Sequence, residues 1–182
     1  SAGGYLSYEN IADKATVAGV EVEVRKNLFV RPVSSAANGM NKLSFGLNGS
    51  YIYTNAKMPL ATVTTGSQLE GAAPWIANFD LSHNYTKGDH SFINTLVLNY
   101  VSDKIYTIGT QGYQDIMEQE IMILDFVSQA KLNKYISLTL KARNLLNPSY
   151  KLSRKANESG EEVVLSDYKK GINISLGVSC TF

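Results

Sequence analysis

The last stretch of the chain alternates between apolar residues and small or polar ones. Every even position from Ile172 to Phe182 is apolar, and the odd positions between them are glycine, serine, threonine or asparagine. Successive side chains of a β-strand point to opposite faces, so this period of two gives one apolar and one wettable face. The period of a helix would mix the two faces. The pattern therefore predicts a long strand at this end of the chain.

Six earlier segments show the same alternation. In one of them Val20, Val22 and Val24 alternate with charged residues, whereas Val97 and Val101 break the alternation in another and leave its facing open. Seven strands are predicted, over residues 15–27, 42–55, 74–86, 91–103, 119–132, 135–147 and 170–182. Each is near or above the roughly 10 residues that a tilted strand needs to cross a bilayer, whereas strands in soluble proteins average about 5–6.

Short and long connections alternate between the predicted strands. Residues 87–90 and 133–134 predict tight turns, and 28–41 is longer than this scheme expects. Three segments predict long polar loops: 56–73, 104–118 and 148–169. Membrane barrels of antiparallel strands show this asymmetry, with short turns on the periplasmic side and longer loops outside.

A period of two alone does not separate a membrane barrel from a soluble ligand-binding barrel or sandwich. Two further features favour the membrane. The polar positions are mostly serine, asparagine, threonine and glycine rather than the lysine and glutamate of a soluble surface. Aromatic residues gather towards strand ends, as in the girdles of outer-membrane barrels: Tyr51, Tyr53, Tyr85, Tyr100, Tyr135 and Phe182.

The composition excludes several classes of protein and of site. The chain has 182 residues, a formal net charge of +1 and 18% charged residues, so nucleic acid is not an expected partner. Its uninterrupted apolar runs, such as Ile121–Leu124, are too short for a membrane-spanning helix. Cys180 is the one cysteine, so neither an internal disulfide nor a cysteine pair for zinc is expected.

Several short sequences, taken together, resemble the C-terminal barrel region of TonB-dependent outer-membrane receptors, especially those of Bacteroidota. The matching pieces follow one another in order: Asn10–Ala15, Gly19–Glu23, Gly49–Thr54, Gly71–Trp75, Asn78–Leu81, Lys141–Tyr150 and the terminal strand ending at Phe182. The order and spacing of these pieces cover nearly the whole chain, and together they are more specific than any one of them.

The resemblance implies a barrel of about 22 strands filled by an N-terminal plug that carries the energy-coupling box. Seven strands cannot close such a cylinder, and an odd number is unusual for a bacterial barrel. We therefore expect residues 1–182 to be the C-terminal segment of a barrel whose remaining strands and plug lie in the same protein or another chain. The expected partners are outer-membrane lipid, the barrel-insertion machinery and, through the plug, the inner-membrane energy-coupling complex.

Two groups of residues are candidates for function. Gly177, Cys180 and Phe182 resemble the C-terminal signal that the barrel-insertion machinery reads, although Leu176 departs from the polar residue expected before the glycine. Five charged residues are expected to face the lumen, where they would meet the plug or a passing substrate: Glu21, Glu23, Arg25, Lys141 and Arg143. Such charges more often satisfy one another or water.

No metal, cofactor or catalytic site is predicted. The two histidines, His83 and His90, have no ligand spacing around them, and no nucleophile elbow or phosphate-binding glycine loop occurs. The leading hypothesis is a receptor for energy-coupled uptake of a siderophore, vitamin, glycan or peptide. A small structural or adhesion barrel of eight strands, with residues 1–9 as the eighth, is the alternative, and a soluble ligand-binding barrel or a barrel enzyme ranks below it.

Overall fold

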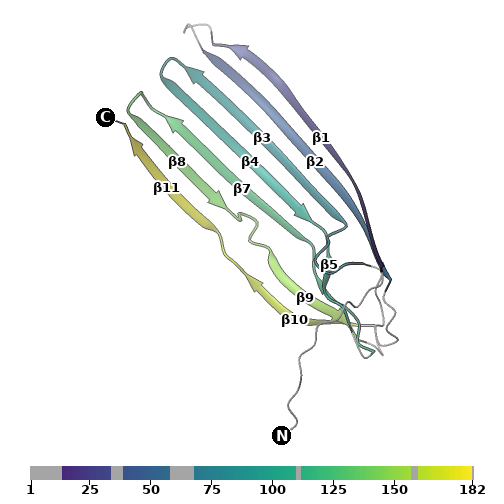
Figure 1. Ribbon diagram of the computed structural model, residues 1–182. Coiled ribbons are helices and arrows are strands. Elements are labelled where there is room, and N and C mark those ends of the chain that lie inside the picture. The colour runs from purple at the N-terminus through teal and green to yellow at the C-terminus, as the bar shows by residue number, and fades with distance from the viewer. Residues whose placement is uncertain (1–13, 34–38, 58–67, 110–111, 157–159, 182) are drawn as a thin grey trace.

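The computed structural model describes residues 14–33, 39–57, 68–109, 112–156 and 160–181. Seven long strands form one antiparallel sheet in the order β1-β2-β3-β4-β7-β8-β11 (Figure 1). Their bounds are β1 Lys14–Pro32, β2 Met40–Lys57, β3 Trp75–Lys87, β4 His90–Val101, β7 Ile121–Lys131, β8 Ile136–Arg143 and β11 Asn173–Cys180. The prediction of an all-β antiparallel fold built on seven long strands is confirmed. The part of the chain that the structure describes contains no helical segment that could span a bilayer.

The register of this sheet, which we call the wall, sorts side chains onto two faces. One row across five strands reads Val24, Leu47, Phe79, Leu98 and Leu124. The next row, on the opposite face, reads Glu23, Asn48, Asn78, Asn99 and Ile123. The pleat therefore gives the wall an apolar face and a polar face, as the alternation in the sequence predicts.

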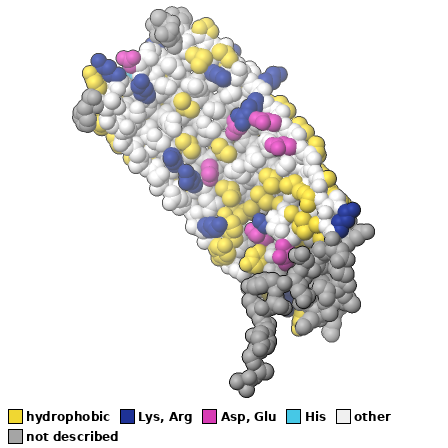
Figure 2. Space-filling model, viewed as in Figure 1, with side chains coloured by type: hydrophobic (Ala, Val, Ile, Leu, Met, Phe, Trp, Pro, Cys, Tyr) yellow, Lys and Arg dark blue, Asp and Glu magenta, His cyan; other side chains and the backbone are white. Residues whose placement is uncertain are grey.

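The register settles the facing of the segment with the irregular alternation. Val97 pairs with Asp80 and Val101 pairs with Ile76, so both valines lie on the polar face. With Ile121 and Ile123 of β7 they make that face partly apolar near the end of the wall. Figure 2 shows charged side chains over the middle of the sheet and hydrophobic side chains gathered towards the end with the long connections.

The first strand is longer than predicted because of a β-bulge. The pairing of β1 with β2 shifts between Asn27 and Phe29, and the strand continues to Pro32. An extra residue in a strand reverses the parity of the residues that follow, so the period of two stops at the bulge although the strand does not. The predicted end at residue 27 was therefore wrong, and the connection to β2 is residues 33–39 rather than the unexpectedly long 28–41.

Two of the predicted long polar loops contain a second sheet. Its strands are β5 Lys104–Thr107, β6 Ile116–Glu118, β9 Ser149–Lys155 and β10 Glu162–Lys169, in the order β10-β9-β6-β5. The prediction of long polar loops over 104–118 and 148–169 is corrected by these strands. Each of them continues a wall strand after a break of two to five residues, so the order of the second sheet repeats the order β11-β8-β7-β4 of the wall (Figure 1).

The buried side chains of the described residues lie at the end of the wall next to the second sheet and within that sheet. They are Thr54, Ala56, Ala73, Ser102, Ile105, Ile108 and Ser153. Part of the predicted loop 56–73 packs there. Gly71 donates a backbone hydrogen bond to the Ile105 carbonyl (2.8 Å), and the Leu69 N–H donates to the Thr54 hydroxyl (3.1 Å). Residues 1–9, the eighth strand of the alternative barrel, lie outside the described residues.

Two asparagines hold the break between β8 and β9 against the break between β10 and β11. Asn144 and Asn147 have positive φ angles of 60° and 43°, and Gly171 opposite them has a φ of 81°. The Asn144 side-chain amide donates to the Gly171 carbonyl at 2.7 Å, and the Gly171 N–H donates to the Asn147 side-chain oxygen at 3.0 Å. Asparagine tolerates the left-handed conformation better than other side chains, so these residues suit both the turn and the clamp.

The clamp can be tested with two substitutions of Asn144 in the full-length protein. Asn144→Gly keeps the left-handed backbone but removes the side-chain amide, and we expect a loss of about 1 kcal/mol in unfolding free energy. Asn144→Ala adds the strain of a positive φ and should cost about 1 kcal/mol more. Chemical unfolding in detergent measures both values. Equal stability of the two variants would contradict the assignment of backbone strain to this position.

Candidate functional site

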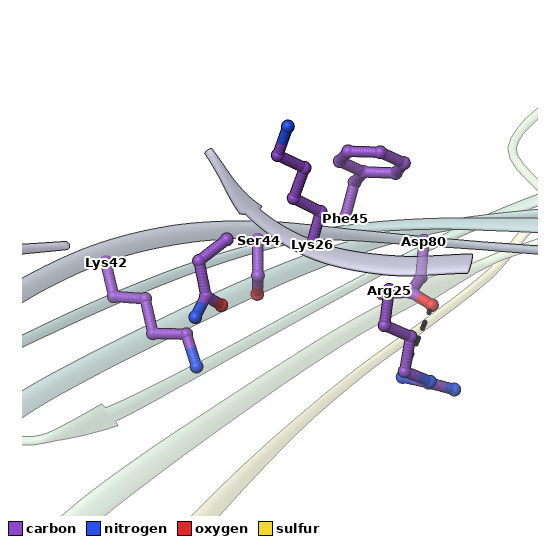
Figure 3. A pocket seen from close by; sticks show the side chains of 7 residues that line it. Arg25, Lys26, Lys42, Ser44, Phe45 and Asp80 are labelled. Atoms are coloured by element: carbon purple, nitrogen blue, oxygen red, sulfur yellow. Dashed lines mark ion pairs between the residues drawn. The ribbon is translucent and has the colours of Figure 1, made fainter. Parts of the chain in front are cut away.

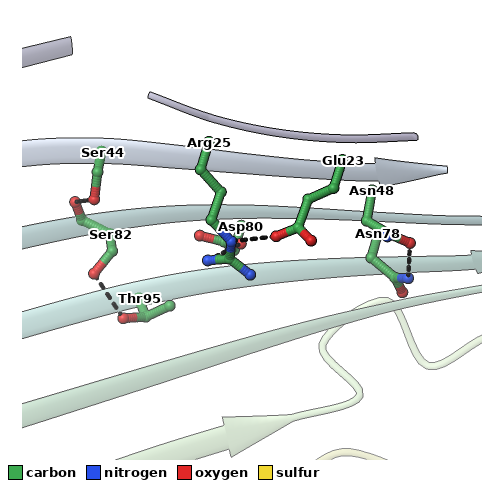
Figure 4. A network of polar contacts seen from close by, with 8 residues as sticks. All are labelled: Glu23, Arg25, Ser44, Asn48, Asn78, Asp80, Ser82 and Thr95. Carbon is green, nitrogen blue, oxygen red and sulfur yellow. Dashed lines mark hydrogen bonds and ion pairs between the residues drawn. The ribbon is translucent and has the colours of Figure 1, made fainter. Parts of the chain in front are cut away.

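Charged and amide side chains of β1, β2 and β3 form two neighbouring groups of polar contacts, which we call the network, on the polar face (Figure 4). The Arg25 Nε donates to Glu23 Oε1, and the Arg25 Nη1 lies 3.9 Å from Asp80 Oδ1. Asn48 donates to Glu21 and accepts from Asn78 Nδ2 at 3.4 Å. One cation thus lies between two carboxylates, with amides on the neighbouring row.

Gly46 makes room for the contact that crosses β2. It pairs with Arg25 on one side and with Asp80 on the other, so it lies between the two charges. A Cβ built on Gly46 would overlap the Asp80 carboxylate. The absence of a side chain at this position therefore lets Arg25 of β1 reach Asp80 of β3 across the strand between them.

Hydroxyl groups extend the polar contacts along β2, β3 and β4. Ser44 Oγ donates to the Ser82 carbonyl at 3.5 Å, and the hydroxyls of Ser82 and Thr95 lie 3.1 Å apart (Figure 4). Each hydroxyl can donate and accept, so the row offers hydrogen bonds in either direction. The face is thus polar between its charged groups as well as at them.

Two open hollows flank the Arg25 side chain. One, of about 320 Å³, is lined by Arg25, Lys42, Ser44 and Asp80, and Figure 3 shows Lys26 and Phe45 pointing to the opposite side of the sheet. The other, of about 250 Å³, lies between Glu23, Arg25, Asn48, Asn78 and Asp80. No carboxylate pairs with Lys42 among the described residues, so the first hollow carries an uncompensated positive charge.

The network is exposed, which limits its contribution to stability. The Arg25 side chain is 72% exposed and the Glu23 side chain 50% exposed. Exposed ion pairs contribute about 0–1 kcal/mol, because water and salt screen them. The arrangement therefore presents charge to whatever occupies the space beside this face and does little to hold the wall together.

Lys141 and Arg143, the other two charged candidates, lie on the same face but far from this network. Lys141 pairs with Val127 and Ser175, and Arg143 pairs with Asn173. Five strand steps separate β1 from β8 in the order of the wall, a distance of roughly 24 Å along the sheet. The structure therefore brings Glu21, Glu23 and Arg25 together and keeps Lys141 and Arg143 apart from them.

Five further residues of the site were not predicted from the sequence: Lys42, Gly46, Asn48, Asn78 and Asp80. The alternation within each strand shows which face these residues occupy. Their proximity to Arg25 depends instead on the register between strands. The two-residue turn Gly88–Asp89 between β3 and β4 is the clearest signal for a register, because it fixes one hairpin. The bulge in β1 removes the corresponding signal for the hairpin that carries Arg25.

Acidic side chains at the second sheet have individual partners. Glu118 pairs with Lys104 at 3.3 Å, Tyr100 donates to Glu120 at 2.6 Å and the Gly109 N–H donates to Asp115 at 2.7 Å. On β10, a hydrogen bond from the Ser153 hydroxyl and then the Lys151 ammonium, 3.0 Å away, lower the pKa of Glu162. The Glu162 contacts therefore favour the folded sheet above the usual pKa of glutamate and lose that effect as the pH falls through the lowered value.

Two of the three residues compared to an assembly signal, Gly177 and Cys180, lie on β11. Gly177 pairs with Thr139 on the polar face, and Cys180 pairs with Ile136 on the apolar face, where it is an exposed free thiol. Phe182 lies outside the described residues. Their role in assembly stays a prediction.

The described residues hold no group of three or more His, Cys, Asp or Glu side chains that could bind a metal ion. His83 instead lies on the apolar face, in register with Leu43 and Asn94. Its Nε2 is 2.9 Å from Asn41 Oδ1.

The comparison with protein families agrees with this architecture. The family described as TonB dependent receptor-like, beta-barrel, matches residues 1–145. The chain belongs to this family. No curated protein and no solved structure matches the chain. The proteins of the family are receptors and transporters of the outer membrane rather than enzymes.

Because the family lies in the outer membrane, each face and each end of the wall can be assigned to lipid, lumen, periplasm or the cell exterior. In outer-membrane barrels the apolar face meets lipid and the polar face meets the lumen, so we assign the polar face with Arg25 and Asp80 to the lumen. By the general rule for outer-membrane barrels, we assign the short connections 33–39, 88–89 and 132–135 to the periplasmic end and the long connections with the second sheet to the extracellular end.

Aromatic side chains mark the two membrane interfaces on the lipid-facing side. Tyr51 and Trp75 pack with ring centroids 4.5 Å apart near the extracellular end, and Tyr85 and Phe92 pack at 6.4 Å near the periplasmic end. Trp75 and Tyr85 lie on one strand with a separation of roughly 33 Å, which a tilt of about 40° reduces to roughly 25 Å along the membrane normal. This distance matches the height of about 25 Å of the apolar band in outer-membrane barrels.

A pair of glycine substitutions tests the role of Gly46. Gly49 of the same strand has no heavy atom within 4 Å of an added Cβ, so Gly49→Ala should stabilise the full-length protein by about 0.5 kcal/mol. Gly46→Ala should be less stable than Gly49→Ala by about 1 kcal/mol, because the methyl group displaces Asp80 from Arg25. Thermal unfolding in detergent compares them, and an equal gain from both substitutions would show that the close approach at Gly46 is absent.

Proposed function

We propose that this chain forms part of a TonB-dependent receptor for energy-coupled uptake of a nutrient, and that its polar face lines the path beside the plug. The observation that carries the proposal is the exposed network of Arg25, Glu23 and Asp80 on the lumenal face. Charges that serve only the fold would be expected to neutralise one another, whereas Lys42 beside them has no carboxylate partner among the described residues.

The place of the chain in the whole receptor is the second part of the proposal. Within the described residues, β1 and β11 are each paired on one side, and an unpaired strand edge is costly in lipid. Residues 1–182 then form the C-terminal segment of a barrel of about 22 strands, with the plug outside this segment. The inner-membrane energy-coupling complex acts on the receptor through that plug.

The last strand has a proposed role in assembly. Gly177, Cys180 and Phe182 would be read by the barrel-insertion machinery before the strand is paired on both sides. Ile174, Leu176 and Val178 are exposed along β11, which supports this role. An edge strand of this kind offers the machinery both unpaired backbone hydrogen-bonding groups and a hydrophobic face.

The role of the lumenal charges can be tested by complementation. The chromosomal gene is deleted, and the full-length gene or a variant is supplied on a plasmid. Growth on a panel of scarce nutrients should show at least one whose use requires both the receptor and an intact energy-coupling complex. Arg25→Ala and Lys42→Ala should lower uptake of that nutrient by about tenfold, a factor that corresponds to about 1.4 kcal/mol.

Arg31→Ala is the matched control, because Arg31 pairs with Asn41 in register on the lipid-facing side and should leave uptake unchanged. Heat-modifiable migration on a gel confirms that each variant is folded. The proposal fails if uptake does not require the coupling complex, if Arg25→Ala and Lys42→Ala both transport normally, or if the full-length gene encodes no plug.

A further inference from the structure

The lipid-facing side of the wall carries a groove of about 510 Å³ near the extracellular end. Its floor is formed by Gly49 of β2 and Ala77 of β3, which pair with each other in register. Aliphatic and aromatic side chains surround this floor: Val20, Val22, Tyr51, Trp75 and Tyr100. Ser50 and Ile76, whose side chains belong to the lumenal face, complete the lining, and no charged side chain takes part.

The groove exists because small residues interrupt a row of larger ones. Gly49 stands between Val22 and Ala77, whereas the next row on the same face contains Val24, Leu47 and Phe79. Gly49 is not among the residues with a positive φ, and an added Cβ would meet nothing within 4 Å. Neither the backbone nor a close neighbour requires a glycine here, so the open space is the property that Gly49 provides.

The aromatic side of the groove contacts the break between β4 and β5 and the break between β6 and β7. The Trp75 N–H donates to the Ser102 hydroxyl, and the Ser102 N–H donates to the Trp75 carbonyl, each at 3.0 Å. The Tyr100 hydroxyl donates to Glu120 at 2.6 Å. The hydrogen bonds with Ser102 fix the backbone of Trp75, and its side chain stays available to a ligand because the residue is 56% exposed. A site that is formed before binding loses less entropy when the ligand enters.

We propose that this groove binds one acyl chain of a lipid of the outer leaflet. The groove is continuous with the lipid-facing surface, and its lining of apolar side chains suits a hydrocarbon chain. It lies beside the extracellular aromatic girdle of Tyr51 and Trp75, at the depth of the upper acyl chains. A peptide strand is not the expected occupant, because the backbones of β1 to β4 pair with one another here. The inference rests on the membrane location of the family and is independent of the transported substrate.

Photo-crosslinking of the full-length receptor tests the site directly. The receptor is placed in phosphatidylcholine nanodiscs that contain a trace of lipid with a diazirine midway along one palmitoyl chain. After irradiation, mass spectrometry compares adducts on the peptides of residues 47–53 and 75–81 with adducts on the equally lipid-facing strand β8. We expect adducts to concentrate on the two groove peptides.

Filling the groove should remove this preference. Gly49→Leu should lower labelling of the groove peptides by about tenfold, which corresponds to about 1.4 kcal/mol, and Gly49→Ala should have an intermediate effect. Ala142→Leu, on the same face of β8, is the matched control and should leave groove labelling unchanged. Heat-modifiable migration shows that each variant is folded.

Three results would overturn the assignment. Adducts could be no denser in the groove than on β8, which would mean ordinary contact with bulk lipid. Folded Gly49→Leu could label as strongly as the unsubstituted receptor. Groove residues could crosslink to a protein that copurifies from native membranes while the lipid probe fails to label them, which would make the groove a protein interface.

Discussion

Pairing of backbone hydrogen-bonding groups between neighbouring strands is the interaction on which this structure depends. In the hydrocarbon of a membrane an unpaired N–H or C=O group costs several kcal/mol, and a β-wall avoids that cost only through continuous ladders. The ladders from β1 to β11 are long and antiparallel, with one bulge at Asn27 to Phe29. Side chains contribute little to this cohesion, because the wall between its two ends buries almost none of them.

Packing of side chains takes over where the chain leaves the membrane. The second sheet contains the buried residues Ile105 and Ser153, and Ile108 just after β5 and Ala73 just before Trp75 are buried beside it. Water at that level can satisfy the backbone at the interruptions, so bends at residues 102–103, 119–120, 144–148 and 170–172 are tolerated there. One continuous set of strands thus gives a membrane wall and an extracellular extension with different sources of stability.

The sequence predicted the wall well because lipid and lumen impose opposite preferences on alternate residues. All seven wall strands were found in this way, and the strongest alternation, at β11 and β2, gave the clearest predictions. The second sheet was missed because its strands are three to eight residues long and lie outside the membrane, where neither face must be apolar throughout. The end of β1 was missed because the bulge reverses the parity that the prediction followed.

The charged residues on β1 and β8 could be assigned to one face from parity alone, but their grouping could not. Arg25 meets Asp80 only because Gly46 leaves the space between them open, and that contact depends on the registers of two hairpins. The same limit applies to the groove at Gly49, which arises from small residues that are neighbours across strands and distant in sequence. Features within one strand were therefore predictable, and features across strands were not.

Site-directed spin labelling along β4 of the full-length receptor in liposomes tests the two-faced wall most directly. β4 is the most demanding strand, because Val97 and Val101 are apolar yet lie on the lumenal face. Labels at positions 96, 98 and 100 should be accessible to oxygen, and labels at 97, 99 and 101 should be accessible to a water-soluble nickel complex. Accessibility that followed residue hydrophobicity instead of position, or that was the same on both faces, would contradict the account.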